Sequence, residues 1–178
     1  MKKFTKILAA AFMAAVMAFS VCACGADEKA NDQIPNPMTE VDEKGLVEAT
    51  GIDMPAPEGA TDVKYFVYNL SNGVVMGEMR FTFDGNSFSL RSQSTGAVEI
   101  ADAEDISGLF YEFEEPVAAS VGGRNANVFI SKDGTVGYIT WIDVVPGILY
   151  NLSCTEGIDA AKLELVAGNT FYSVQGDA

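Results

Sequence analysis

Reactive side chains of several kinds are scarce in this chain, and one kind is missing altogether. The sequence has 25 acidic residues and three cysteines but no histidine. A Ser-His-Asp triad, a Cys-His dyad and a zinc site with histidine ligands are therefore excluded within the chain. The sequence also lacks a Gly-x-Ser-x-Gly turn, a Cys-x-x-Cys pair and a glycine-rich loop leading into a helix. We therefore expect no enzyme, no catalytic residue, no cofactor and no metal ligand.

Carboxylates are the one catalytic group present in quantity, and they gather in two short clusters. Calcium binding needs several oxygens at about 2.3–2.6 Å. The first cluster has the right donors but not the loop pattern of a calcium motif. Glycoside hydrolysis needs only two carboxylates at a set separation, so a carboxylate-dependent hydrolase of cell-wall glycans stays an alternative function. The clusters are Asp102, Glu104 and Asp105, and Glu112, Glu114 and Glu115.

Aromatic rings offer a second kind of candidate site. Tyr138, Trp141 and Tyr150 fall on two neighbouring predicted strands. Together they could form a stacking surface for a sugar or a peptide. Aromatic side chains on central strands more often belong to the core, so both interpretations of these three residues are kept.

Two of the three cysteines lie one residue apart, directly after an N-terminal apolar run. Three lysines precede the run and small residues follow it, which is the order of a secretory signal peptide spanning 1–23. An uncleaved membrane anchor is the alternative, because the run with its flanks approaches the roughly 20 residues that a span needs. A disulfide between Cys22 and Cys24 is disfavoured, since closing so small a ring strains the bond.

The residues Val21-Cys22-Ala23-Cys24 resemble the lipobox of bacterial lipoproteins, with an aliphatic residue three positions before the modified cysteine and a small residue directly before it. The resemblance implies cleavage between Ala23 and Cys24, a diacylglyceryl group on the thiol of Cys24, and acylation, with palmitate expected among the chains. Two or more acyl chains hold a protein stably, at about 0.8 kcal/mol per buried methylene. We expect a secreted protein held by this lipid anchor at the outer face of the bacterial cell membrane.

The chain is strongly acidic. Its formal charge of −14 becomes −17 once Lys2, Lys3 and Lys6 leave with the signal peptide. Such a chain repels polyanions, so we expect no nucleic-acid partner. About 155 residues remain after cleavage, which is enough for one domain with a substantial core. Cys154 is then the one unmodified thiol, so no internal disulfide supports the fold, and we expect it to be a small buried side chain.

Turn and cap residues divide the mature chain. Residues 24–40 are polar and contain two prolines, which indicates a lipidated N-terminus and a flexible linker before a single domain over 41–178. Thr39 or Asp42 is expected to cap a short helix that stops at Gly51. A last helix is expected to begin near Glu156 and to end before Gly168.

Alternating apolar and polar residues predict seven or eight mostly antiparallel strands between these helices. The expected fold is α+β, with a helix near each end of the mature domain and one sheet face covered by the helices. A small barrel or sandwich plugged by the helices is the alternative. The strands are expected at 63–68, 74–83, 88–91, 109–115, 117–121, 128–130, 136–145 and 148–154. The turns are expected at Asn72-Gly73, Asp84-Gly85, Gly122-Gly123, Asp133-Gly134 and Pro146-Gly147.

Six short pieces of the mature chain together resemble a family of small membrane-anchored lipoproteins of clostridia-like Gram-positive bacteria, whose domain has no known activity. The pieces are IPNPMTEV, PEGATDVKY, EDISG, VGGR, DGTV and W-x-D-x-x-PG-x-x-Y. The resemblance implies a secreted, membrane-tethered domain and brings no catalytic residue with it. The leading hypothesis is a non-catalytic domain that binds an envelope protein or a small solute. A chaperone or assembly factor for exported proteins is a further alternative, and it would show an exposed apolar groove.

Overall fold

The computed structural model describes residues 37–97, 99–145 and 147–174. The expected signal peptide, the cleavage and lipidation site at Ala23 and Cys24, and the linker as far as residue 36 lie outside the described residues. Those expectations remain predictions. No helix in the part of the chain that is described is long and apolar enough to cross a membrane.

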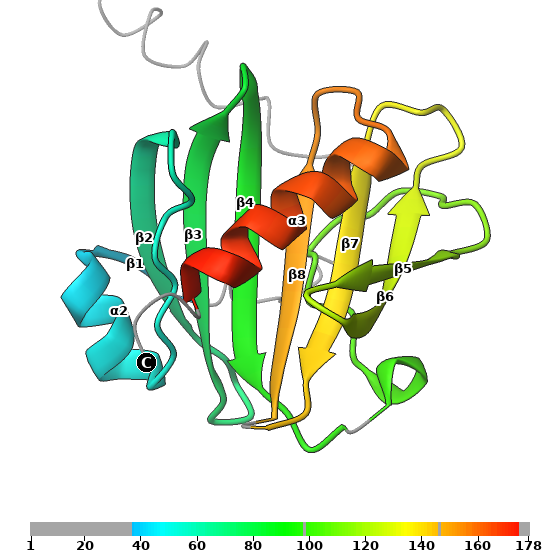
Figure 1. The fold of residues 1–178 in the computed structure, drawn as a ribbon. Coiled ribbons are helices and arrows are strands. Elements are labelled where there is room, and N and C mark those ends of the chain that lie inside the picture. The colour runs from blue at the N-terminus through cyan, green and yellow to red at the C-terminus, as the bar shows by residue number, and fades with distance from the viewer. Residues whose placement is uncertain (1–36, 98, 146, 175–178) are drawn as a thin grey trace, which may run out of the picture. The chain divides into compact units, whose positions relative to one another are not determined.

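Eight strands form a single sheet in which every neighbouring pair is antiparallel (Figure 1). The first four strands follow one another across the sheet; the chain then crosses to the far edge and returns, which gives the order β1-β2-β3-β4-β8-β7-β6-β5. The strands are β1 (Met38–Val41), β2 (Thr61–Asn69), β3 (Val75–Phe83), β4 (Asn86–Ser94), β5 (Val117–Val121), β6 (Arg124–Ile130), β7 (Gly137–Asp143) and β8 (Ile148–Cys154). The predicted α+β class is confirmed, and the sheet is open rather than a barrel or a sandwich.

Both α-helices of the described chain pack on one side of the sheet, which we call the helix face. Helix α2 (Glu43–Thr50) lies over β2 and β3, and α3 (Ala160–Val174) runs diagonally across the other half (Figure 1). The main core fills the space between them and includes Leu46 from α2, Leu163 from α3, and Met79 and Ile139 from the sheet. Gly77 allows the close approach of α2, because a Cβ there would lie 2.9 Å from Leu46.

The first helix has the ends that its sequence predicts. The Asp42 carboxylate accepts a hydrogen bond of 2.7 Å from the Gly45 amide, and Gly51 closes the helix in the left-handed conformation at φ 71°. Strand β1 immediately before it was not predicted. It pairs with β2 from Met38 to Val41, so the sheet begins inside the segment expected to be linker.

Two predicted elements are wrong. Residues 109–115 form no strand; one isolated bridge joins Phe113 to Ser131, and the Phe110 side chain is 97% exposed. The last helix does not end at Gly168 but continues to Val174. A glycine inside a helix costs about 1 kcal/mol, and burying Phe171 against the core outweighs that cost.

The side of the sheet opposite the helices, which we call the polar face, is half covered by a long connection. Residues 99–116, the crossover segment, link β4 to β5 and include the short 3-10 helix η2 (Ile100–Asp102). Ile106 and Ile100 pack on Ile142 and Leu149 in a second, smaller apolar cluster. The other half of the polar face carries charged and hydroxyl side chains, among them Glu78, Arg80 and Ser89.

Candidate functional site

Strand pairing brings charged residues of β3 and β4 together on the polar face. Glu78 lies between Phe66 on β2 and Arg91 on β4, and its neighbour Arg80 lies between Lys64 and Ser89. Side chains two residues apart on a strand share a face, so Glu78 and Arg80 point the same way. One buried acid therefore has two arginines beside it.

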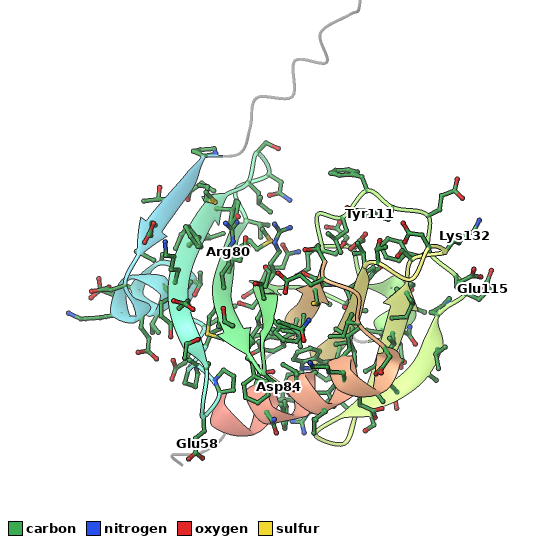
Figure 2. The ribbon with its side chains drawn as sticks, turned by 90° about the horizontal axis from the view of Figure 1, so that it is seen from above. Glu58, Arg80, Asp84, Tyr111, Glu115 and Lys132 are labelled. Carbon is green, nitrogen blue, oxygen red and sulfur yellow. The ribbon has the colours of Figure 1, made fainter. Side chains whose placement is uncertain are left out.

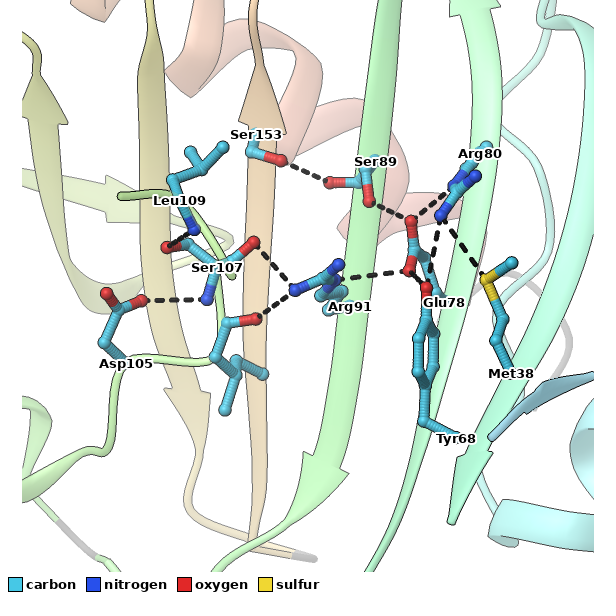
Figure 3. Close-up of polar contacts among 11 residues, drawn as sticks. Met38, Tyr68, Glu78, Arg80, Ser89, Arg91, Asp105, Ser107, Leu109 and Ser153 are labelled. Carbon is cyan, nitrogen blue, oxygen red and sulfur yellow. Dashed lines mark hydrogen bonds and ion pairs between the residues drawn. The ribbon is translucent and has the colours of Figure 1, made fainter. Parts of the chain in front are cut away.

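The Glu78 carboxylate is 1% exposed and accepts hydrogen bonds from four side chains (Figure 3). Nε of Arg80 donates at 2.6 Å and the hydroxyl of Ser89 at 2.8 Å. The Tyr68 hydroxyl donates to the other carboxylate oxygen, and Nε of Arg91 donates to the same oxygen at 3.3 Å. Both oxygens are thus fully engaged, as a buried charge requires.

These contacts decide the charge of Glu78. Burial alone would raise the pKa of its carboxyl, but the hydrogen bonds from Arg80 and Tyr68 and the charge of Arg91 outweigh burial and lower the pKa. The pKa of Tyr68 is raised by burial and by its bond to Glu78. Glu78 is therefore ionised and Tyr68 is neutral near pH 7. A carboxylate held in this way cannot serve as a general acid, which needs a raised pKa.

Arg91 ties the network to the crossover segment. Its Nη1 atom donates to the backbone carbonyls of Ile106 at 3.1 Å and Ser107 at 2.8 Å. Gly108 follows in the left-handed conformation at φ 68°, and a Cβ there would collide with Nη1 of Arg91. The glycine is therefore required by both its backbone angle and its neighbour.

Arg80 stands at the boundary between this network and solvent. Its side chain is 44% exposed and stacks over the Phe66 ring at 4.5 Å, and Nη2 donates to the Tyr68 hydroxyl at 3.1 Å. Figure 2 shows Arg80 on the side of the sheet away from α3. Within the described chain, Nη1 of Arg80 has no hydrogen-bond partner. The guanidinium is therefore fixed through Nε and Nη2, while the two N–H donors of Nη1 have no partner in the described chain.

Arg80 also lines an open pocket of about 270 Å³, which we call the Arg80 pocket. Its polar lining comes from Asp62, Arg80, Thr82, Ser87, Ser89, Ser153 and Thr155. Three of the hydroxyls are held in place: Ser89 donates to Glu78, Ser153 donates to the carbonyl of Ser89 at 3.4 Å, and Ser87 donates to the exposed carboxylate of Glu156 at 3.1 Å. A β-bulge between Thr61 and Lys64 forms one rim, and bulges of this kind often re-aim side chains next to functional sites.

Lys64 is a second cation beside Arg80, although it is not part of the pocket lining. It lies directly opposite Arg80 in the strand register and is exposed. Among residues 37–97, 99–145 and 147–174 it makes no ion pair, whereas the other lysines and arginines do. Lys64, Arg80 and Arg91 therefore gather around the one buried carboxylate of Glu78, while the exposed carboxylates of Asp62 and Glu156 also lie at the pocket.

The three aromatic residues predicted as a ligand surface do not share one surface. Trp141 and Tyr150 stack with ring centroids 5.2 Å apart, and both are buried in the main core on the helix face. Tyr138 is on the polar face, where Phe113 covers it with centroids 5.0 Å apart. Burial raises the pKa of Tyr138 and of Tyr150 to about 12. The core interpretation describes where all three side chains lie.

The acidic clusters remain dispersed. Asp105 accepts a hydrogen bond from the Ser107 amide, and the exposed Glu112 pairs with Lys132 at 3.1 Å. No three cysteine, aspartate or glutamate side chains of the described residues lie close enough together to hold a metal ion.

A larger pocket of about 410 Å³ lies at the ends of β6 and β7 and is lined by Glu99, Arg124 and Asp143 among others. Arg124 is the one cation among the described residues that line this pocket, and it already has partners. Arg124 pairs with Asp143 at 3.1 Å, donates to the carbonyl of Gly122 and stacks over Phe171. The Arg80 pocket is the better candidate because Arg80 keeps donors on Nη1 that have no partner in the described chain.

Sequence reasoning missed Glu78, Arg80 and Arg91, although a signal for them was present. The Asp84-Gly85 turn fixes the β3–β4 register, and counting outward from it sets Glu78 opposite Arg91 and Arg80 opposite Ser89. Comparison with protein-family models, with curated proteins and with solved structures finds no match for this chain.

Proposed function

We propose that this chain is an exported lipoprotein, held at the outer face of the cell membrane through lipid on Cys24, whose domain binds a small solute of the envelope in the Arg80 pocket without transforming it. The leader and lipobox pattern support the location, and the pocket supports the binding role. The observation that carries the binding role is the state of Arg80, which is fixed by Glu78 and Tyr68, lines an open pocket rich in hydroxyls, and keeps Nη1 donors without a partner in the described chain.

Pre-organisation is the physical reason for preferring binding. A ligand that meets a mobile arginine must order it, at about 0.5–1.5 kcal/mol per side chain. Here that ordering is done during folding by a buried carboxylate. The hydroxyls of Ser89 and Ser153 are held in the same way.

The two alternative functions find less support among the contacts. A glycan hydrolase needs a carboxylic acid that can give up a proton. Glu78, the buried acid beside Arg80, has a lowered pKa with both oxygens engaged, and the other two acids at the pocket, Asp62 and Glu156, are exposed. A chaperone for exported proteins needs a continuous apolar groove. The exposed large apolar side chains of the described residues, such as Val47, Phe110 and Leu165, lie on separate elements instead.

Ligand-induced thermal shifts of the purified protein test the binding role. Wild type and Thr82→Trp would be screened against peptidoglycan fragments, sugars and amino acids. Thr82 lines the pocket and is partly exposed, so the indole should fill the pocket without entering the core. Ser71→Trp, in the exposed β2–β3 turn, is the matched control. We expect at least one compound to raise the melting temperature of wild type and Ser71→Trp but not of Thr82→Trp; no shift with any component would overturn the proposal.

The anchor is tested separately. Cells grown with radiolabelled fatty acid should label the wild-type protein and leave Cys24→Ala unlabelled. Label on both proteins, or on neither, would contradict lipidation at Cys24.

A further inference from the structure

The geometry of the Arg80 pocket points to its ligand class: we infer that the pocket binds an anionic group, a carboxylate or a phosphate, between Arg80 and Lys64. This inference rests on the proposed binding function and names the chemistry that the site would recognise. Neither the motifs of the sequence nor the acidic composition of the chain predicts it.

The first argument is the unused hydrogen-bonding capacity of Arg80. A guanidinium has five N–H donors, and Glu78, Tyr68 and Met38 take those on Nε and Nη2. The donors on Nη1 remain without a partner in the described chain, and Arg80 is one of the residues that line the pocket. Arginine donors match the oxygens of carboxylates and phosphates better than any other side chain does.

The second argument is charge. Arg80 and Arg91 share the one charge of Glu78, and Lys64 has no ion pair within the described chain. Two carboxylates also lie at the pocket: Asp62 in its lining, and Glu156, which accepts hydrogen bonds from the amide and the hydroxyl of Ser87. The anion is therefore expected beside Arg80 and Lys64, away from the Ser87 end of the pocket. Lys64 and Arg80 are directly opposite on β2 and β3, so one small anion can contact both.

The third argument is the position of Glu78. If Glu78 itself were exposed, it would repel an anion. It is instead buried beneath Arg80, and its oxygens are covered by four donors. Glu78 is therefore a positioning residue, which holds the guanidinium in place while its own charge is shielded from the pocket.

Isothermal titration of the full-length protein with inorganic phosphate and with acetate, at constant ionic strength in sodium chloride, tests the inference. Constant ionic strength is needed because salt screens exposed charges over about 8–10 Å. We expect saturable binding of one anion per chain. Lys64→Gln should weaken binding at least threefold, and Arg80→Gln at least tenfold. Whichever anion binds more tightly identifies the group.

Lys132→Gln is the matched control, because it removes one positive charge from an exposed side chain on the crossover side of the sheet. It should change the dissociation constant less than twofold. Arg80→Lys keeps the positive charge beside Glu78, so this variant separates a loss of binding from a loss of folding. Its circular dichroism spectrum should match that of wild type, and it should bind the anion more weakly than wild type does. Equal effects of Lys64→Gln and Lys132→Gln would overturn the inference.

The outcomes separate this inference from the proposed function. An uncharged sugar that shifts the melting temperature of wild type but not of Thr82→Trp, together with no binding of phosphate or acetate, would overturn the anion and leave the binding role in place. No response to any of these probes would overturn both.

Discussion

The carboxylate of Glu78 and the guanidinium of Arg91 form an ion pair of 3.3 Å across strands β3 and β4, underneath the crossover segment. The same guanidinium donates to two backbone carbonyls of that segment, so one pair of side chains joins the sheet to its cover (Figure 3). On its other side the carboxylate holds Arg80 at the edge of an open pocket. Stability and binding are therefore expected to depend on the same acid.

Removing Glu78 should be strongly destabilising. Glu78→Ala would leave Arg91 with a largely buried and unpaired charge, and breaking one partner of a buried pair costs about 3–5 kcal/mol. Urea unfolding of the purified protein would measure the loss. Glu112→Ala breaks an exposed pair with Lys132 and should cost less than about 1 kcal/mol. Equal losses for the two variants would contradict a structural role for the buried network.

Stability should fall at acidic pH in a way that depends on Glu78. The pKa of the folded carboxyl is lowered from its ordinary value of 4.5, so the unfolded chain binds more protons below that pH. The contribution of Glu78 is therefore fully present above about pH 4.5 and is lost as the pH falls through the folded pKa. Asp133, whose hydrogen bonds from Ser131 and Thr135 lower its pKa to about 2, acts with the same sign.

The measurement is the free energy of unfolding between about pH 3 and pH 7 for wild type and Glu78→Gln. Because Asp133 is common to both proteins, the difference between the two curves isolates Glu78. We expect the wild-type curve to be steeper below about pH 4.5. Parallel curves would contradict a lowered pKa.

The crossover segment should loosen when Gly108 is replaced. Gly108→Ala puts a Cβ into the space of the Arg91 guanidinium and adds left-handed strain, for a combined cost of about 2–4 kcal/mol. Gly96→Ala is the control, since a Cβ there meets nothing within 4 Å. Limited proteolysis should cut Gly108→Ala within residues 99–116 faster than Gly96→Ala. Identical cleavage rates would show that Arg91 does not hold the segment down.

The thiol of Cys154 should be unreactive in the folded protein. It is buried in the main core, and burial raises its pKa. In a chain with Cys22 and Cys24 replaced by alanine, a thiol-specific disulfide reagent should modify Cys154 only after denaturant is added. Ser71→Cys in the exposed β2–β3 turn should react at once in the native protein. Rapid native modification of Cys154 would place it outside the core.

Local chemistry in the sequence accounts for much of the fold. Asn72-Gly73 and Asp84-Gly85 mark two hairpins, and Asp42 with Gly51 marks both ends of α2, because each signal acts within a few residues. Strand β1 carries no such signal: its four residues become a strand only because β2 offers a free edge. The alternation in 109–115 predicted a strand, but the segment forms only one isolated bridge there, with the Phe113 ring packed against Phe129 and Tyr138.

The candidate site was harder to predict because it depends on register and on the crossover segment together. Alternation already separates Tyr138 from Trp141, since residues three apart on a strand face opposite sides. The register of β3 and β4 follows from their turn, so the meeting of Glu78 and Arg91 was within reach of the sequence. The carbonyls of Ile106 and Ser107 above Arg91 were not, because the path of a long connection is set by tertiary packing.

Hydrogen exchange of the full-length protein, with and without the envelope component that gives the largest thermal shift, tests the central claim most directly. A ligand in the Arg80 pocket should slow amide exchange in β2, in the β3–β4 hairpin and at the end of β8, which together line the pocket. It should leave α2 and β5 unchanged. Protection confined to α2, β5 or the crossover segment, or no protection at all, would contradict a binding function at Arg80.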